Sequence, residues 1–422
     1  MRGGVKVGAR CAGRAVRVVA LAVPAAVRTA LTRRGRRDRR GAEELARVLE
    51  RLGGAFLKAG QFLGARPDLV GETVADALGR LQDDVAPMTA RQAVRAVRAA
   101  LPGAPPELAA ACAAPPVASG SIACVYRARV GGRAVAVKVR RPGVGDALAA
   151  DMALLRGAAA AAGRLPFLRR VPLAEIAARV AQALTGQLDF AAEAANLRRL
   201  RADLADVPGV VVPDVVPELC GDGVITMEFV EGLDRGAECS LTRGERREAV
   251  TRLVRAVYRM LFVTGRVHAD LHQGNVYLVR GGGVVLLDAG FVVALSASAR
   301  RRFTEFFGGM IRGDGELCAR ALLASVRRVE PGADLGAFRR RVADLVERAE
   351  GRTAAEFDLP AFCLELFDLQ RRYRLFAEPE FVFPMLCLLA AEGAVRRHHP
   401  TLDFQMEAAP YAMQGLLLSG DA

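Results

Sequence analysis

The stretch that most constrains this chain is a short β-hairpin flanked by two oxygen-bearing side chains. Residues 276–279 and 284–287 have the pattern of β-strands, and the glycine-rich turn 280–283 supplies the positive φ angles that a tight reversal needs. Asn275 directly precedes the first strand and Asp288 directly follows the second. Because both are equally far from the turn, an antiparallel register predicts that they lie opposite each other. An amide oxygen and a carboxylate together suit a hard cation such as Mg²⁺.

A third polar residue, Asp270, lies on the segment that enters the hairpin. The order H-x-D-x-x-x-x-N, from His268 to Asn275, followed by D-x-G at Asp288, is typical of the catalytic half of protein-kinase-like phosphotransferases. There Asp270 would accept or orient the proton of the nucleophile, while Asn275 and Asp288 would hold the metal on the phosphates. An ordinary hairpin with polar ends is the alternative. His268 and His272 are expected to hold the shape of the loop by hydrogen bonds rather than to bind a metal.

A second candidate cluster lies upstream, on two strands joined by Gly131 and Gly132. In the second strand, R-A-V-A-V-K-V, valines alternate with two alanines and Lys138, so Lys138 shares a face with small side chains. V-A-V-K is typical of a lysine that binds nucleotide phosphates, and a lysine snorkelling at a sheet edge is the alternative. The preceding loop is expected to cover the phosphates with its backbone N–H groups. It consists of four small residues: Ala118, Ser119, Gly120 and Ser121.

Glu193 is the candidate partner of Lys138. It lies within residues 173–200, which have a helical pattern, and its carboxylate would position the lysine on the α- and β-phosphates. More residues separate Lys138 from Glu193 than separate the corresponding pair of an ordinary kinase, which indicates an insertion between them. Within this insertion, residues 147–162 also have a helical pattern. A buried-type strand at 224–229 then leads into V-E-G, which we expect to be an interlobe hinge. Its backbone groups would hold an adenine, and the residues concerned are Met227, Glu228 and Val230.

The charge of the chain is concentrated at its beginning. Residues 1–40 contain twelve Lys and Arg residues and one acidic residue, so this head supplies +11 of the formal net charge of +14. A basic head favours an anionic surface, either lipid or nucleic acid. The apolar run 18–26 is too short to cross a bilayer, which needs about 20 residues. We expect the head to be a basic stretch that lies on a membrane face, with a disordered tail as the alternative. Nucleic-acid binding is disfavoured because the head has no aromatic side chains near it on which bases could stack.

Size and cysteine usage indicate an intracellular protein of several lobes. A chain of 422 residues can bury a large core. Its eight cysteines form no C-x-x-C and have no histidine at zinc spacing, so we expect reduced, mostly buried thiols and a cytoplasmic location. Four segments are predicted: a basic head (1–40), an N-terminal helical extension (41–113), an N-lobe (114–232) and a mainly helical C-lobe (233–422).

Six motifs occur in one order along the chain. These are K-x-G-Q at Lys58 and Gln61, the small-residue loop, V-A-V-K, D-F-x-x-E-A-x-N, H-A-D-L-H-Q-G-N and L-L-D-x-G. Together they resemble the UbiB family of atypical kinases, also called aarF-domain-containing kinases, from about residue 41 to about residue 411. The resemblance implies an α+β, two-lobed protein-kinase-like fold, with the K-x-G-Q helices over the active site.

The same resemblance implies an activity and its surroundings. It implies binding of ATP or ADP with Mg²⁺, ATPase-type activity, and support of isoprenoid-quinone (ubiquinone) biosynthesis at membranes, with quinone-biosynthesis proteins as partners. Members often end in transmembrane helices, whereas this sequence ends at Ala422 before any. We therefore expect peripheral contact with the inner face of the cytoplasmic membrane.

The chain departs from the family pattern at several positions. The E-x-D motif of the family reads Gln187-Leu188-Asp189, so a charge that could pair with Lys58 becomes a neutral amide. Gly120 stands where the family usually has alanine, and Ala289 replaces the usual phenylalanine of the metal-binding element. Neither change removes one of the groups expected to act on the nucleotide.

Three functions remain open from the sequence. The first is an ATP-dependent phosphotransferase or ATPase of the atypical kinase type, acting at a membrane surface in quinone or lipid metabolism. The second is a small-molecule phosphotransferase, because aminoglycoside and choline kinases share the H-x-D-x-x-x-x-N loop; the K-x-G-Q element disfavours it. The third is a non-catalytic nucleotide-binding scaffold.

Overall fold

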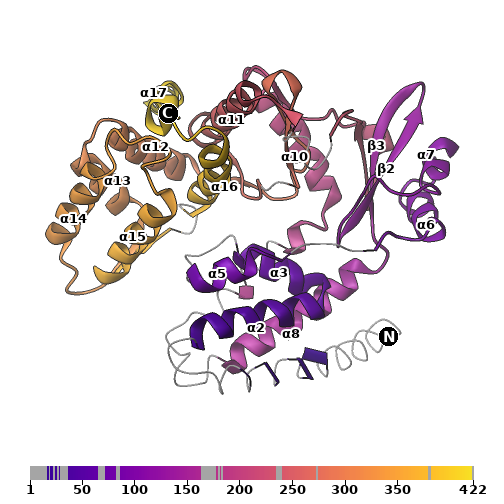
Figure 1. The fold of residues 1–422 in the computed structure, drawn as a ribbon, viewed down its shortest axis with the longest axis horizontal. Helices are drawn as coiled ribbons and strands as arrows, with labels where there is room; N and C mark the ends of the chain where they lie inside the picture. Colours follow the sequence, from indigo (N-terminus) through magenta and orange to yellow (C-terminus); the bar gives the residue numbers. More distant parts are fainter. Residues whose placement is uncertain are drawn as a thin grey trace. The chain divides into compact units, whose positions relative to one another are not determined.

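The computed structural model describes most of the chain. The described residues are 17–18, 20–21, 24–25, 28, 37–64, 72–81, 86–162, 177–178, 181, 184–233, 240–271, 274–378 and 382–420. Two compact units are present: Met1–Ala194 with Val215–Phe229, and Ala195–Asp214 with Val230–Ala422 (Figure 1). Both combine helices with small sheets, which confirms the predicted α+β class. Within the described residues, no helix combines the length and apolarity needed to cross a membrane.

The first unit contains a four-stranded antiparallel sheet with helices on one face. Valine side chains of β3 (Arg133–Arg140) pack with Tyr126 against helices α6 (Ala90–Ala100) and α7 (Pro106–Ala111), which lie beside the strands in Figure 1. Lys138 therefore belongs to the opposite face, as the alternation along the strand predicts. The strands follow the order β1 (Ala118–Ser119), β2 (Ala123–Val130), β3 (Arg133–Arg140) and β5 (Val224–Glu228).

An N-terminal helical layer belongs to the same unit. Its helices pack around Phe56 and Leu78, and α3 (Gly54–Gly64) also contacts α8 (Val144–Ala162) through Ala59 and Met152. Gly53, with φ +62°, lets the chain turn between the first two helices. The layer consists of α2 (Arg37–Leu52), α3 (Gly54–Gly64) and α5 (Glu72–Leu78).

Part of the basic head packs against α2. The Arg28 guanidinium donates two hydrogen bonds to the Glu44 carboxylate, of 3.0 and 2.7 Å, and Glu44 is only 1% exposed. Arg17 donates to the carbonyl of Arg51 at 2.8 Å. Most of the remaining head lies outside the described residues, so its membrane contact stays a prediction.

The described part of the second unit contains three small sheets, of which the third pairs β10 (Val326–Val329) with β11 (Leu375–Ala377). Helix α11 (Arg243–Tyr258) packs against the first of them and continues into a single π-helical turn, Arg259–Thr264. Gly265, with φ +67°, ends that turn and directs the chain into β6 (Arg266–His268). The first sheet has the order β4 (Val210–Val211), β8 (Gly283–Leu286) and β7 (Val276–Val279), and the second pairs β6 (Arg266–His268) with β9 (Val292–Ala294).

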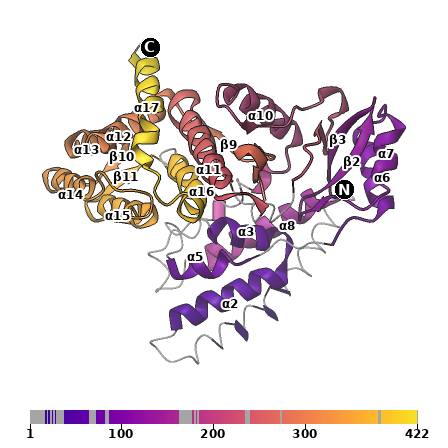
Figure 2. The ribbon, with the colours of Figure 1, turned by 45° about the horizontal axis from the view of Figure 1, so that its top comes forward.

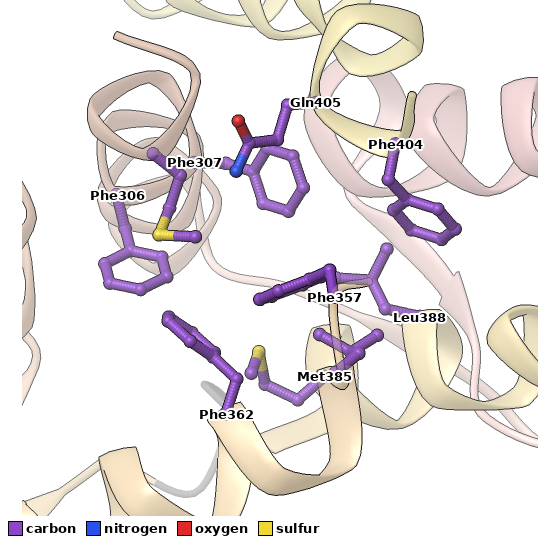
Figure 3. Close-up of a pocket in the computed structure, with 10 residues that line it drawn as sticks. Phe306, Phe307, Phe357, Phe362, Met385, Leu388, Phe404 and Gln405 are labelled. Carbon is purple, nitrogen blue, oxygen red and sulfur yellow. The ribbon is translucent and has the colours of Figure 1, made fainter. Parts of the chain in front are cut away.

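Aromatic side chains form a core between helices of the second unit, whose ribbon is drawn in Figure 2. Tyr258 is fully buried, its hydroxyl donates to the carbonyl of Phe404 at 2.6 Å, and the centre of its ring lies 5.7 Å from that of Phe262. Figure 3 shows the adjoining apolar cavity, where Gln405 donates to the carbonyl of Ala349 at 3.1 Å. The remaining elements are α12 (Ala297–Ile311), α13 (Gly315–Ala324), β10 (Val326–Val329), α14 (Leu335–Glu347), α15 (Leu359–Arg372), β11 (Leu375–Ala377), α16 (Val382–His398) and α17 (Phe404–Gly420).

The cysteines of the described residues agree with the expectation of free thiols. Six are free, and five of these are buried, namely Cys112, Cys124, Cys318, Cys363 and Cys387. Burial raises the pKa of the Cys112 and Cys318 thiols to about 12, which keeps them protonated and unreactive at neutral pH.

Candidate active site

The ion pair between Lys138 and Glu193 is present in the first unit. Lys138 Nζ lies 2.5 Å from Glu193 Oε1, and the two side chains are 15% and 2% exposed. The lysine sits on a strand paired on both sides, opposite Val125 of β2 and Ile225 of β5. Its Nζ also lies 5.4 Å from the centre of the Phe190 ring. A buried carboxylate in direct contact gives the ammonium group one preferred direction, as a phosphate-binding lysine requires.

Helix α10 (Phe190–Asp203) carries Glu193 in its first turn and begins later than predicted. Asp189 Oδ1 accepts a hydrogen bond from the backbone N–H of Ala192 at 2.9 Å, so Asp189 is the N-cap. Arg140 of β3 donates to the carbonyl of Leu188 at 2.9 Å and holds the preceding turn. The prediction of one helix over residues 173–200 is therefore wrong at 187–189, because an aspartate that caps a new helix competes with continuation of the old one.

Of the four residues expected from the family-specific motifs, the structure describes the side chains of two, Gln187 and Asp189. Gln187 lies in the turn before α10 and is half-buried, and Asp189 is exposed at the cap. Lys58 and Gln61 are three residues apart on α3 and so share one of its faces. Their side chains lie outside the described part of the structure, and their reach into an active site stays a prediction.

The loop of Ala118, Ser119, Gly120 and Ser121 is held by an arginine that sequence reasoning missed. Arg141, directly after β3, donates to the Gly120 carbonyl at 2.7 Å and to Ser119 Oγ at 2.8 Å. It also donates to the carbonyl of Ala86 at 2.8 Å. The Gly120 N–H donates to the Ala123 carbonyl at 2.9 Å, so this group is used within the loop and not offered to a ligand. The sequence feature that could have indicated this contact is the pair Arg140-Arg141, directly after V-A-V-K-V.

In the second unit, His268 connects the loop of Asp270 to the turn of Asp288. The imidazole is fully buried, its Nε2 lies 2.5 Å from the Asp288 carbonyl, and the Asp270 N–H donates to its Nδ1 at 3.2 Å. A carbonyl only accepts and a backbone N–H only donates, so the ring is neutral with its proton on Nε2. His268 thus holds the shape of the loop, as expected, while His272 lies outside the described residues.

Asn275 and Asp288 lie at the two ends of the hairpin, but the register differs from the predicted one. Val276 pairs with Leu286, and the Leu287 N–H donates to the Asn275 carbonyl at 3.0 Å, so Asn275 lies opposite Leu287. The cause is the turn Arg280–Gly282, a single 3₁₀ turn with two glycines at positive φ, after which Gly283 already belongs to β8. The prediction that Asn275 and Asp288 lie directly opposite each other is therefore wrong by one residue.

The donor atoms of this region fit a magnesium ion. Asn275 Nδ2 donates to the Asp270 carbonyl at 3.0 Å, so Oδ1 is the atom that the amide could offer to a cation. Asp288 supplies a carboxylate, of which Oδ1 also accepts the Gly290 N–H at 2.8 Å. Among the described residues, no three His, Cys, Asp or Glu side chains form a metal cluster. One carboxylate and one amide oxygen suit Mg²⁺, which keeps waters and binds together with substrate phosphates.

Comparison with known proteins identifies the family. The model of the ABC1 atypical kinase-like domain matches residues 80–322, more than half of the chain. The chain belongs to the ABC1 atypical kinase-like family. This confirms the resemblance in sequence and supports a kinase-like function. Among solved structures, the complex of Rv3197 with erythromycin from Mycobacterium tuberculosis is similar, with 23% identity and a TM-score of 0.47, over 84% of this chain and 94% of that one.

The match covers the polar residues of both units in this ABC1 kinase-like chain. Lys138, Glu193, Asp270, Asn275 and Asp288 all lie within it, whereas the K-x-G-Q element precedes it.

The residues expected at the hinge of the ABC1 domain lie where one unit ends and the other begins. Met227 is buried in β5, Glu228 is exposed at the end of that strand, and Val230 is the first residue of the next stretch of the second unit. Phe229 N–H donates to the carbonyl of Ala134 on β3 at 3.1 Å, so the backbone is held up to this point.

The hairpin of the ABC1 domain is fastened to α11 by Glu245. Its carboxylate accepts the N–H of Gly281 in the hairpin turn at 3.0 Å and the N–H of Thr242 at the start of the helix at 2.8 Å. These hydrogen bonds, that of Gly281 first, lower the pKa of Glu245 to about 2. A carboxylate with a lowered pKa stabilises the fold above its ordinary pKa near 4.5, and this contribution is lost as the pH falls toward 2.

We expect Glu245→Gln to lower the free energy of unfolding at pH 7 and to flatten its decline between about pH 4.5 and about pH 2. A glutamine cannot lose this contribution on acidification because it carries no titrating proton. Denaturant unfolding of the wild type and the variant from pH 7 to pH 2 measures the difference. Glu347→Gln, an exposed position on α14, is the control, and equal acid slopes for wild type and Glu245→Gln would contradict the assignment.

Proposed function

We propose that this chain is an ATP-dependent phosphotransferase or ATPase that binds ATP, or ADP, with Mg²⁺. The observation that carries the proposal is the buried imidazole of His268, bonded to the backbone of both Asp270 and Asp288. One rigid group thereby fixes the residue of the H-x-D motif relative to that of the D-x-G motif. Structural hairpins have no need of such a connection, whereas a catalytic base and a metal ligand must keep a constant separation.

Each polar residue then has a definite task. Lys138, oriented by Glu193, would bind the nucleotide phosphates, and the loop of residues 118–121 would border them. Asp270 would accept or orient the proton of the attacking oxygen, whether it belongs to water or to an acceptor hydroxyl. Asn275 and Asp288 would hold Mg²⁺, which, when bound, neutralises charge that develops on the phosphates. The backbone at Met227, Glu228 and Val230 would hold the adenine.

We propose further that the protein acts at an anionic membrane surface in isoprenoid-quinone or lipid metabolism. The support for this is the head of the chain, which carries +11 of the net charge. Phosphate release from Mg-ATP should increase with vesicles of phosphatidylglycerol and phosphatidylcholine, and not with phosphatidylcholine alone. Replacing Arg33, Arg34 and Arg36 with Gln should remove the increase while keeping the Arg28–Glu44 contact. Equal rates with and without anionic vesicles would overturn the membrane proposal.

The same assay distinguishes the small-molecule alternative. We expect phosphate release without any added acceptor, and no transfer of the γ-phosphate to choline or to aminoglycosides. Efficient transfer to either would replace the proposed function by that of a small-molecule kinase. Binding of Mg-ATP without turnover would leave only the nucleotide-binding scaffold.

A further inference from the structure

The D-A-G turn that follows β8 is held by its backbone. The Asp288 carbonyl accepts from His268, and the Gly290 N–H donates to Asp288 Oδ1. The carbonyl between them, that of Ala289, accepts a hydrogen bond of 3.1 Å from Asn196 Nδ2. The turn is therefore fastened from β6 on one side and from α10 on the other.

Asn196 lies within helix α10, where asparagine is unfavourable. Its cost in a helix interior relative to alanine is comparable to what one hydrogen bond returns. Asn196 is followed by Leu197, which is fully buried, so this part of the helix packs against its surroundings and is not a frayed end. Asn196 is thus better explained by what its side chain binds than by the helix that it belongs to.

The residue at the centre of the turn makes such a support necessary. Ala289 is fully buried, but its side chain is a single methyl group and fastens the backbone weakly. The hydrogen bond from the amide to the Ala289 carbonyl fixes the backbone of the turn, as a larger side chain would otherwise do by packing. An asparagine is suited to this because its Nδ2 donates, whereas an aspartate of the same shape could only accept.

We infer that Asn196 is a positioning residue for the metal-binding turn, which it keeps in the conformation that directs the Asp288 carboxylate. This role rests on the proposed function, because it is the task given to Asp288 that makes the conformation of the turn matter. Asn196 touches neither nucleotide nor metal in this scheme and acts through the Ala289 carbonyl.

The first test needs no nucleotide. Hydrogen–deuterium exchange of the peptide that spans residues 286–292 should be about two- to tenfold faster in Asn196→Ala, the change expected when one hydrogen bond is lost. Asn196→Asp should exchange faster still, because its carboxylate repels the carbonyl. Arg198→Ala, at an exposed position of the same helix, should exchange as the wild type does. Wild-type exchange in Asn196→Ala would overturn the inference.

The second test measures the Mg²⁺ concentration that gives half-maximal phosphate release at saturating ATP. It should rise by a similar factor in Asn196→Ala and more in Asn196→Asp, while the melting temperature of Asn196→Ala stays within a few degrees of the wild type. Faster exchange with unchanged half-saturation would overturn the positioning role and leave the proposed function intact. A wild type that neither binds nor hydrolyses Mg-ATP would overturn the proposed function itself, and with it the role at the metal.

Discussion

Replacing Asp270 with asparagine should lower the rate of ATP hydrolysis by a factor of about 10² to 10⁴, the usual contribution of a positioned proton acceptor. Asparagine has the same shape but cannot take up a proton. The contact of Asp270 with His268 is made by the backbone N–H, so the loop should keep its conformation. Phosphate release, measured with the affinity for Mg-ATP, separates loss of chemistry from loss of binding.

The controls for this variant are a distant charge and the fold itself. Glu347→Gln on α14 removes one negative charge at an exposed position and should leave the rate unchanged. The melting temperature of Asp270→Asn should remain near that of the wild type. Hydrolysis at the wild-type rate would contradict the role assigned to Asp270 and favour a nucleotide-binding scaffold.

Breaking the Lys138–Glu193 pair should destabilise the first unit strongly and abolish nucleotide binding. In Lys138→Ala the Glu193 carboxylate, only 2% exposed, remains buried without its cation, and such a loss typically costs about 3–5 kcal/mol. The double substitution Lys138→Met with Glu193→Leu removes both charges and should recover most of the free energy of unfolding. Denaturant unfolding of the three proteins measures this recovery.

The double variant also separates stability from function. It should fold like the wild type and yet bind Mg-ATP weakly, because the ammonium group proposed to bind the phosphates has been removed. Weak binding by Lys138→Ala alone would be ambiguous, since a partly unfolded protein also binds poorly. Recovery of ATP hydrolysis in the double variant would show that the pair is a structural one.

The sequence predicted those parts of the site that follow from strict periodicity. Side chains alternate along a strand without exception, so the valines of β3 placed Lys138 on the face away from α6 and α7. The register of the hairpin was predicted from a four-residue turn, 280–283, and a glycine-rich turn of three residues fits the same strand pattern equally well. Only the three-residue turn Arg280–Gly282 shifts Asn275 to lie opposite Leu287.

Hydrogen bonds from side chains to backbone carbonyls could not be predicted from the sequence. Arg141 holds Gly120 and Asn196 holds Ala289 through main-chain oxygens, which every residue has and which leave no mark on the partner in sequence. The break before α10 was missed for a related reason. Asp189 fits a helix interior as a solvent-exposed residue almost as well as it fits an N-cap, and only the hydrogen bond to Ala192 distinguishes the two.

The central claim is that binding of Mg-ATP depends on the Lys138–Glu193 pair and on Asp288. Calorimetric titration of ATP with and without Mg²⁺ tests it, using the wild type, the Lys138→Met, Glu193→Leu double variant and Asp288→Asn. The account predicts that each variant binds Mg-ATP about 10- to 100-fold more weakly, the worth of a charged contact, and that Asp288→Asn also loses the gain in affinity that Mg²⁺ gives the wild type. A wild type that does not bind Mg-ATP, or wild-type affinity in either variant, would contradict it.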